Sequence, residues 1–117
     1  MKIYLICPVR NITPEQQQEI FNYVVLLESK GQKVHYPPRD VDQEDPTGWT
    51  ICKKHCEALI KSDEVHIFWD VSSKGSHFDL GMAFALDKKL KLVKAYQPDN
   101  EGKSYLKVIN EIQLRSI

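Results

Sequence analysis

Short apolar runs alternate along this chain with longer segments whose apolar residues recur at helical spacing. The first run, Lys2–Cys7, has the sequence KIYLIC and indicates a buried parallel strand. A helix is predicted from about Pro14 to Lys30. Thr13 and Gln16 form a capping-box pattern at its start, and Gly31 follows its end. Its apolar face is formed by Ile20, Phe21, Val24, Val25 and Leu27.

The same alternation continues to the end of the chain. It predicts strands at Lys33–Tyr36, Glu64–Trp69 and Lys89–Lys94, helices capped by Thr47 and Ser76 that end near Ser62 and Asp87, and a last helix over Ser104–Gln113. Pro37 and Pro38 end the second strand, a polar surface loop is expected at Arg39–Pro46, and Gln97–Lys103 is turn-rich. Strands that alternate with helices form a parallel sheet with right-handed crossovers. The predicted fold is α/β, a single domain over residues 1–117 with a doubly wound, Rossmann-like or flavodoxin-like sheet flanked by helices.

Composition narrows the classes of partner. Lys+Arg 16 balances Asp+Glu 16, so the net charge is zero and nothing favours nucleic acid or an anionic membrane as partner. We expect no membrane span, because no apolar run approaches the ~18 residues that a span needs. We expect no signal peptide either, because the N-terminus begins with a strand-like segment. Three cysteines do not suggest a disulfide framework, and a cytoplasmic protein is the expectation.

Ligands of such sheets bind beyond the carboxyl ends of the strands. The loops Cys7–Ile12, Pro37–Thr47 and Asp70–Asp79 therefore define the candidate site. The third loop opens a helix, so backbone amides near Ser76 can face an anion with the helix dipole behind them. Side-chain donors and a glycine that permits close approach complete a phosphate-binding corner; they are Ser72, Ser73, Lys74 and Gly75.

Several residues carry two interpretations at this stage. Asp79 is either the second member of a Ser76-x-x-Asp79 capping box or a nucleophilic or acid/base carboxylate. Trp49 is either a lid over a heterocycle or a packing residue. The C-x-x-H-C pattern of Cys52, His55 and Cys56 is either a metal site or part of a buried helix face.

Other polar residues are expected to have plain structural roles. His35 and His66 have no evident partners and are interpreted as structural. The acidic cluster is interpreted as a solvated loop rather than a metal site, because it lacks the spacing of a calcium loop; it comprises Asp40, Asp42, Glu44 and Asp45.

Three segments together resemble the nucleoside 2-deoxyribosyltransferase superfamily. They are the first strand with Tyr4, the turn C-P-V-R-N, and the run G-S-H-F-D-L-G-M-A-F-A-L-D-K-K that contains Asp79. The resemblance implies cleavage of an N-glycosidic bond by a carboxylate that forms a covalent glycosyl-enzyme. Asp79 matches the glutamate nucleophile of that family and is one methylene shorter. His55 stands where the family usually carries an aspartate.

The resemblance also implies which ligand is bound. Arg10 and Ser73 match phosphate-contacting residues of the branch that hydrolyses 2-deoxynucleoside 5-monophosphates, so a nucleotide is favoured over a free nucleoside. Asp79 and His55 would be the catalytic residues, and the substrate would be bound by Arg10, Ser73, Gly75, Ser76 and Trp49. The family implies no cofactor or metal and a homo-oligomer, most simply a dimer. The alternative is a catalytically impaired module of the same fold that binds or senses a nucleotide.

Overall fold

The computed structural model describes residues 1–96 and 102–115. Its strands are β1 (Lys2–Ile6), β2 (Lys33–His35), β3 (Glu64–Asp70) and β4 (Lys89–Tyr96). Its helices are α1 (Pro14–Ser29), α2 (Pro37–Asp40), α3 (Trp49–Lys61), α4 (Lys74–Ala85) and α5 (Tyr105–Arg115). The predicted turn-rich segment Gln97–Lys103 lies mostly outside the described residues.

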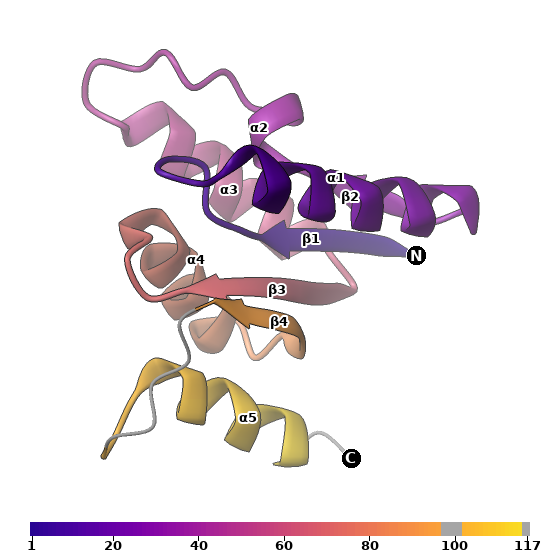
Figure 1. The fold of residues 1–117 in the computed structure, drawn as a ribbon. Helices are drawn as coiled ribbons and strands as arrows, with labels where there is room; N and C mark the ends of the chain where they lie inside the picture. The colour runs from indigo at the N-terminus through magenta and orange to yellow at the C-terminus, as the bar shows by residue number, and fades with distance from the viewer. Residues whose placement is uncertain (97–101, 116–117) are drawn as a thin grey trace.

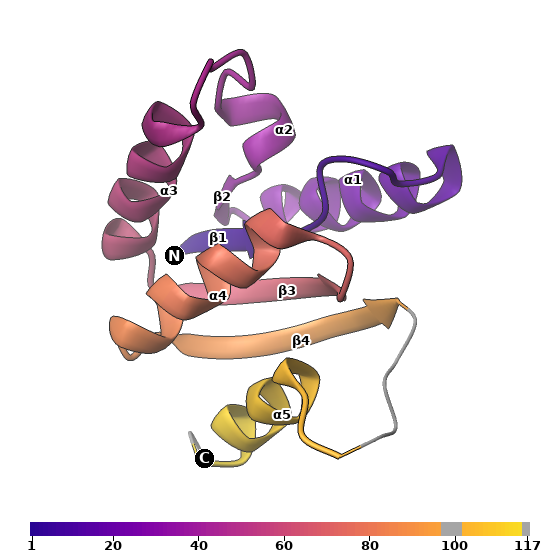
Figure 2. The same ribbon diagram turned by 90° about the vertical axis from the view of Figure 1, so that its left-hand side faces the viewer.

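The four strands form one parallel sheet in the order β2-β1-β3-β4. Tyr4 of β1 pairs with His35 of β2 on one side and with Val65 of β3 on the other. Helix α1 lies on one face of the sheet, and α3 and α4 lie on the other, as Figures 1 and 2 show. The predicted doubly wound α/β fold is thereby confirmed.

Two apolar clusters hold these layers together. Tyr4, Ile67 and Trp69 point toward α3, α4 and α5, where they meet Leu59, Leu80 and Ile109. Leu5 and Phe68 point the other way, toward Ile20 and Val24 of α1. The alternation of residues 4 and 5 between the two clusters follows from the two-residue period of a strand that is covered on both faces.

The chain reverses its winding direction between β1 and β3. The connection after β1 passes through α1 to β2 on one side, and the connection after β3 passes through α4 to β4 on the other. Adjacent loops that leave a parallel sheet in opposite directions open a crevice at its carboxyl edge. Both loops belong to the predicted site, and the fold therefore places them beside each other.

Several predicted boundaries differ from the structure. Pro37–Asp40 is a short helix rather than loop, because Pro37 and Pro38 occupy the first helical positions, where no backbone N–H is needed. Helix α3 starts after Gly48, which has φ +85°, rather than at a Thr47 cap. Strand β4 extends to Tyr96, two residues beyond the predicted end.

The acidic loop before α3 is also more ordered than predicted. The Asp45 carboxylate accepts hydrogen bonds from the backbone N–H groups of Thr47 (3.2 Å) and Ile51 (3.1 Å). Asp42 accepts from the backbone N–H of Glu44, and Asp40 from that of Tyr36. These carboxylates therefore satisfy amides at turns and helix starts. The start of α3 is thus capped by two side chains: Asp45 accepts from the Ile51 amide, and the Thr47 hydroxyl, predicted as the cap, accepts from the Trp49 amide at 3.2 Å.

The amide of Ile51 lowers the pKa of Asp45, which gives a pH-dependent contribution to folding. A carboxylate with a lowered pKa in the folded state stabilises the fold above its unfolded pKa, and this stabilisation is lost as the pH falls through the folded value. We expect Asp45→Asn to lower the thermal midpoint at pH 7 and to match wild type in acid. Thermal melts between pH 3 and pH 7 measure the difference in thermal midpoint between wild type and the variant. A difference that does not change with pH contradicts the assignment of this pH dependence to Asp45.

Candidate functional site

A buried carboxylate joins three elements at the centre of the molecule. Asp79 of α4 is 5% exposed. Its Oδ2 accepts a hydrogen bond from the Tyr4 hydroxyl of β1 at 2.8 Å, and its Oδ1 lies 3.1 Å from Nδ1 of His55 on α3. The partners are 75 and 24 residues away in the sequence. Asp79 is therefore held by tertiary contacts, not by the amides of its own helix.

These contacts exclude the capping-box interpretation of Asp79. The helix begins at Lys74, its N-cap is Ser73, and the Ser73 hydroxyl accepts from the backbone N–H of Ser76. Asp79 thus lies beyond the first turn, on the face of α4 that packs on the sheet. The predicted start of this helix at Ser76 was wrong, because Ser73 and Ser76 both carry hydroxyls and the sequence does not distinguish which one caps.

The donor and acceptor roles in these contacts depend on the charge of the carboxyl group. When Asp79 is ionised it only accepts, so Nδ1 of His55 then carries the proton between them. Burial, reinforced by the negative charge of Asp79, raises the pKa of the Tyr4 phenol, which therefore stays a donor. Nε2 of His55 is buried, and no described residue hydrogen-bonds to it.

His35 extends this cluster along the sheet. Its ring stacks on Tyr4, with 5.1 Å between centroids, and meets His55 edge-on at 6.2 Å. Burial lowers the pKa of His35 and favours its neutral form. His66, on the other face, lies 2.7 Å from the Tyr23 hydroxyl and 3.0 Å from Glu64. His66 therefore has hydrogen-bond partners at both ring nitrogens, whereas His35 has ring contacts and a buried Nε2 that no described residue hydrogen-bonds.

Two thiols lie near the carboxylate without forming a metal site. Burial, with the charge of Asp79 added, raises the pKa of Cys7 to about 12. The same two causes raise the pKa of Cys52. A thiol with a raised pKa is a poor nucleophile and a poor ligand. Within residues 1–96 and 102–115, no three histidine, cysteine or acidic side chains are grouped to hold a metal ion.

The phosphate-binding residues predicted at the start of α4 form a second, smaller group. The hydroxyl of Ser76 is buried and lies 2.9 Å from that of Ser73. Gly75 has an ordinary helical backbone, and a Cβ there would meet no atom within 4 Å. The predicted role of this glycine is close approach of a ligand to the backbone, and no described atom occupies the space beside it. Open space lies above this first turn, whose leading amides have no acceptor within the helix.

Arg10 and Trp49 are placed at the rim. Arg10 is exposed in the loop that follows β1, next to Asn11, which has φ +58°. Trp49 is 65% exposed at the start of α3, and Nζ of Lys53 lies 5.1 Å from its ring centroid. Figure 1 places the starts of α3 and α4 and the loop after β1 at the same edge of the sheet. No described contact joins Arg10 or Trp49 to Asp79.

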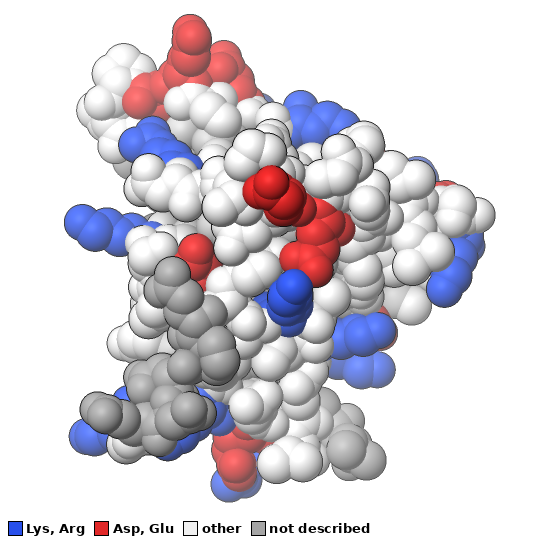
Figure 3. All heavy atoms as spheres, in the orientation of Figure 1, with Lys and Arg blue, Asp and Glu red and all other residues white. Residues whose placement is uncertain are grey.

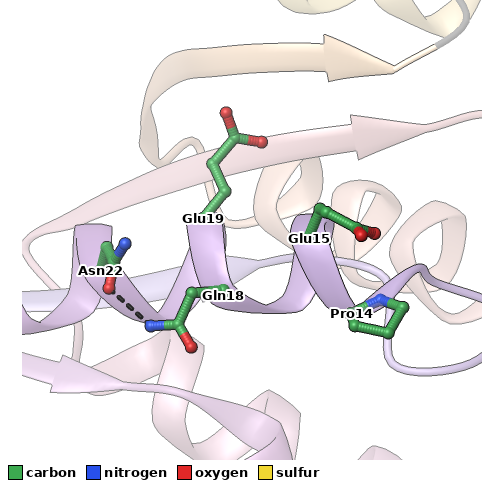
Figure 4. A pocket seen from close by; sticks show the side chains of 5 residues that line it. All are labelled: Pro14, Glu15, Gln18, Glu19 and Asn22. Atoms are coloured by element: carbon green, nitrogen blue, oxygen red, sulfur yellow. Dashed lines mark hydrogen bonds between the residues drawn. The ribbon is translucent and has the colours of Figure 1, made fainter.

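Other surface features lie away from this cluster. In Figure 3, acidic side chains gather over the loop that joins α2 and α3, and elsewhere on that face the two signs are mixed. A hollow on α1 is lined by Pro14, Glu15, Gln18, Glu19 and Asn22, and Figure 4 shows these side chains spread along one helix. None of them approaches Asp79. In the described part of the chain, no helix combines the length and apolarity that a membrane crossing requires.

The fold has known counterparts that act on nucleosides and nucleotides. A structure of the CMP N-glycosidase BcmB from Clostridium botulinum superimposes with a TM-score of 0.65 and 22% identity, over 96% of this chain and 82% of that one. A 2-deoxyribosyltransferase from Bacillus psychrosaccharolyticus superimposes with a TM-score of 0.67 and 21% identity, over 91% and 79%. No family profile and no curated protein sequence matches this chain. The likeness therefore shows the fold, which agrees with the family resemblance of the motifs.

The hydroxyl of Tyr4 is expected to stabilise the fold. Tyr4→Phe leaves one oxygen of a buried carboxylate without its donor, so the free energy of unfolding should fall by about 1–3 kcal/mol. Urea unfolding measures this loss, and Tyr105→Phe on the exposed surface of α5 serves as the matched control. Equal midpoints for Tyr4→Phe and wild type would show that the bond contributes nothing.

Two substitutions of Ser73 distinguish its role as the cap of α4 from a role in binding a ligand. Ser73→Ala removes the cap of α4 and should cost about 1 kcal/mol of stability. Ser73→Asp keeps a capping acceptor but adds negative charge where a phosphate would bind, so it should retain stability and weaken nucleotide binding. Thermal unfolding and calorimetric titration with nucleoside monophosphates give the two measurements. Undiminished binding by Ser73→Asp would remove Ser73 from the phosphate site.

Proposed function

We propose that this chain, as a single nucleoside deoxyribosyltransferase-like domain, cleaves the N-glycosidic bond of a nucleoside or deoxynucleoside 5′-monophosphate. Asp79 is the nucleophile. The observation that carries the proposal is the anchoring of this buried carboxylate by Tyr4 and His55, two side chains from other elements. The placement of α4 at the crevice edge of the sheet supports it. The similarity of the fold to an N-glycosidase and a 2-deoxyribosyltransferase also supports the proposal.

The reaction proceeds in two displacements. An oxygen of Asp79 bonds to C1′ of the sugar, and the C1′–N bond breaks with its electron pair going to the heterocycle, which takes up a proton. A water oxygen then bonds to C1′, the bond from C1′ to Asp79 breaks, and one proton of the water is released. The products are the free base and a sugar phosphate, with retained configuration. These steps need only a carboxylate, a heterocyclic leaving group and water.

The remaining residues bind and orient the substrate in this proposal. Tyr4 and His55 hold Asp79 and balance its charge before attack. Ser73, Gly75 and the free amides of the first turn of α4 face the phosphate, and Arg10 adds a guanidinium from the neighbouring loop. Ser76 orients Ser73 through their 2.9 Å contact. Trp49, exposed at the start of α3, covers the base.

The wider setting of the protein is part of the same proposal. We expect a cytoplasmic homodimer in which a neighbouring chain helps to close the site. Phe84, Tyr105 and Val108 are exposed along a groove between α4 and α5, which the buried Leu80 also lines. A groove of this kind is a suitable surface for a second copy.

One observation favours a second candidate function. Both oxygens of Asp79 are engaged and the residue is 5% exposed, and aspartate reaches less far than glutamate. A misplacement of about 1 Å can cost ~10²-fold in rate. The alternative is therefore a module of the same fold that binds or senses a nucleotide without cleaving it.

The decisive test is release of free base. Wild type, Asp79→Asn and the surface control Asp87→Asn are incubated with ribo- and deoxyribonucleoside monophosphates, and the products are separated by chromatography. We expect base release by wild type and Asp87→Asn, and a loss of at least 10³-fold in Asp79→Asn, because the amide is not a nucleophile.

The alternative function, a module that binds a nucleotide without cleaving it, predicts different results. Failure of wild type to release base, with unchanged behaviour of Asp79→Asn, contradicts the catalytic proposal. Nucleotide-dependent thermal stabilisation without turnover then supports the binding module. Asp79→Glu, alone or with His55→Asp, restores the carboxylates typical of the resembled family. Base release gained by these variants would show that the pocket is otherwise competent.

A further inference from the structure

Nε2 of His55 is a buried polar atom with no hydrogen-bond partner in the described part of the chain. The residue is 8% exposed, and its other ring nitrogen is occupied by Asp79. Buried polar groups are nearly always satisfied in folded proteins, so an unpartnered one indicates a ligand or a water. This atom belongs to the same ring that contacts the proposed nucleophile.

The chemistry of the missing partner follows from the tautomer. With Nδ1 protonated toward Asp79, a neutral His55 presents a lone pair at Nε2, whereas an imidazolium presents an N–H. A hydroxyl group both donates and accepts, so it satisfies Nε2 in either state. A carbonyl or phosphate oxygen, which only accepts, would suit the imidazolium alone. The site is therefore suited to an alcohol.

Within the described residues, the rings packed around His55 form no hydrogen bond with Nε2. The rings of Tyr4 and His35 meet it edge-on, at centroid distances of 6.0 and 6.2 Å. The Tyr4 hydroxyl is committed to Asp79, and Nε2 of His35 is itself buried without a hydrogen-bond partner. A hydroxyl reaches Nε2 only when this packing opens. The contact therefore selects among ligands that bind deep in the site, beside Asp79.

The proposed reaction places hydroxyls there. In a β-nucleoside the base projects from one face of the sugar ring, and the 2′- and 3′-hydroxyls project from the other. A nucleophile that displaces the base attacks from the face of the hydroxyls. The 2′-carbon is bonded to C1′, so a ribose sugar carries its 2′-hydroxyl next to the point of attack. A single ring carbon separates Nδ1, which contacts the nucleophile, from Nε2.

We propose that Nε2 of His55 hydrogen-bonds the 2′-hydroxyl and makes the protein selective for ribonucleoside over 2′-deoxyribonucleoside 5′-monophosphates. This inference rests on the proposed function and adds the identity of the sugar. A 2′-deoxy substrate leaves Nε2 of His55 buried without a hydrogen-bond partner in the complex. This free-energy cost weakens the binding and slows the reaction of the deoxy substrate only. His55 is thereby a specificity-determining residue as well as a partner of Asp79.

Two amide variants separate the nitrogens of His55. The amide of asparagine occupies the place of Nδ1, so His55→Asn keeps a donor to Asp79 and removes Nε2. The amide of glutamine extends to the place of Nε2, so His55→Gln keeps a polar atom there and removes the donor to Asp79. The experiment measures kcat/KM for AMP, CMP, GMP and UMP and for their deoxy counterparts. Calorimetry with ribose 5-phosphate and 2-deoxyribose 5-phosphate measures binding independently of turnover.

We expect wild type to favour the ribo form by about 10- to 100-fold, as for loss of one buried hydrogen bond. His55→Asn should bring this ratio close to one, and His55→Gln should retain most of it at a lower absolute rate. Turnover of both forms with a ratio that His55→Asn leaves unchanged overturns the inference while leaving the proposed function intact.

The sugar phosphates separate the two proposals when there is no turnover. If wild type releases no base from any nucleotide, the proposed function fails. Tighter binding of ribose 5-phosphate that is lost in His55→Asn would then still support the assignment of Nε2. Equal binding of the two sugar phosphates by wild type would overturn it.

Discussion

The buried carboxyl group of Asp79 is the constraint around which the centre of the molecule is arranged. A carboxylate taken out of water must be hydrogen-bonded or paired, and here a phenol from the sheet and an imidazole from the helix layer packed on it provide the hydrogen bonds. The same contacts attach α3 and α4 to β1. The central strand and the two helices that flank the crevice are thus joined through one polar cluster inside an apolar layer. Loss of any of its three members would leave a buried polar group without its partner.

The proposed chemistry uses this arrangement in a specific way. A nucleophile that is held by two donors is oriented before substrate arrives, but it must exchange those donors for a bond to carbon. In this proposal, the first turn of α4 binds the phosphate at a fixed distance from Asp79 along the same helix. Burial of the cluster excludes water until a ligand enters. The competing interpretation, a binding module, uses the same burial without the exchange of bonds.

The layered fold was predictable because its signals are local and repeated. Buried runs such as KIYLIC and helical faces such as Ile20–Val24 each indicate one element, and their alternation implies a parallel sheet. The exact starts of the helices were harder to predict, because neighbouring residues compete for the same capping position. Two prolines start a short helix where loop was expected, and Ser73 takes the capping role that Ser76 could have taken. The role of Asp79 depends on residues 24 and 75 positions away, so no local motif could decide between a cap and a tertiary anchor. The resemblance identified Asp79 and His55, whereas the contacts of His35 required the pairing of β2 with β1.

A shift in the pairing of β3 with β4, between Ile67 and Phe68, determines which face of the sheet the side chains at the end of β4 occupy. Ile67 pairs with Leu92 and Phe68 with Lys94, so one residue of β4 is skipped. This turns Lys94 and Tyr96 toward α1, where both side chains hydrogen-bond to Glu19. Regular pairing of the same sequence would place Val93 opposite Phe68 and would turn Lys94 and Tyr96 to the other face of the sheet. The hydrogen bonds that link the outer strand β4 to α1 therefore depend on one extra residue in β4, which keeps these two side chains on the side of Glu19.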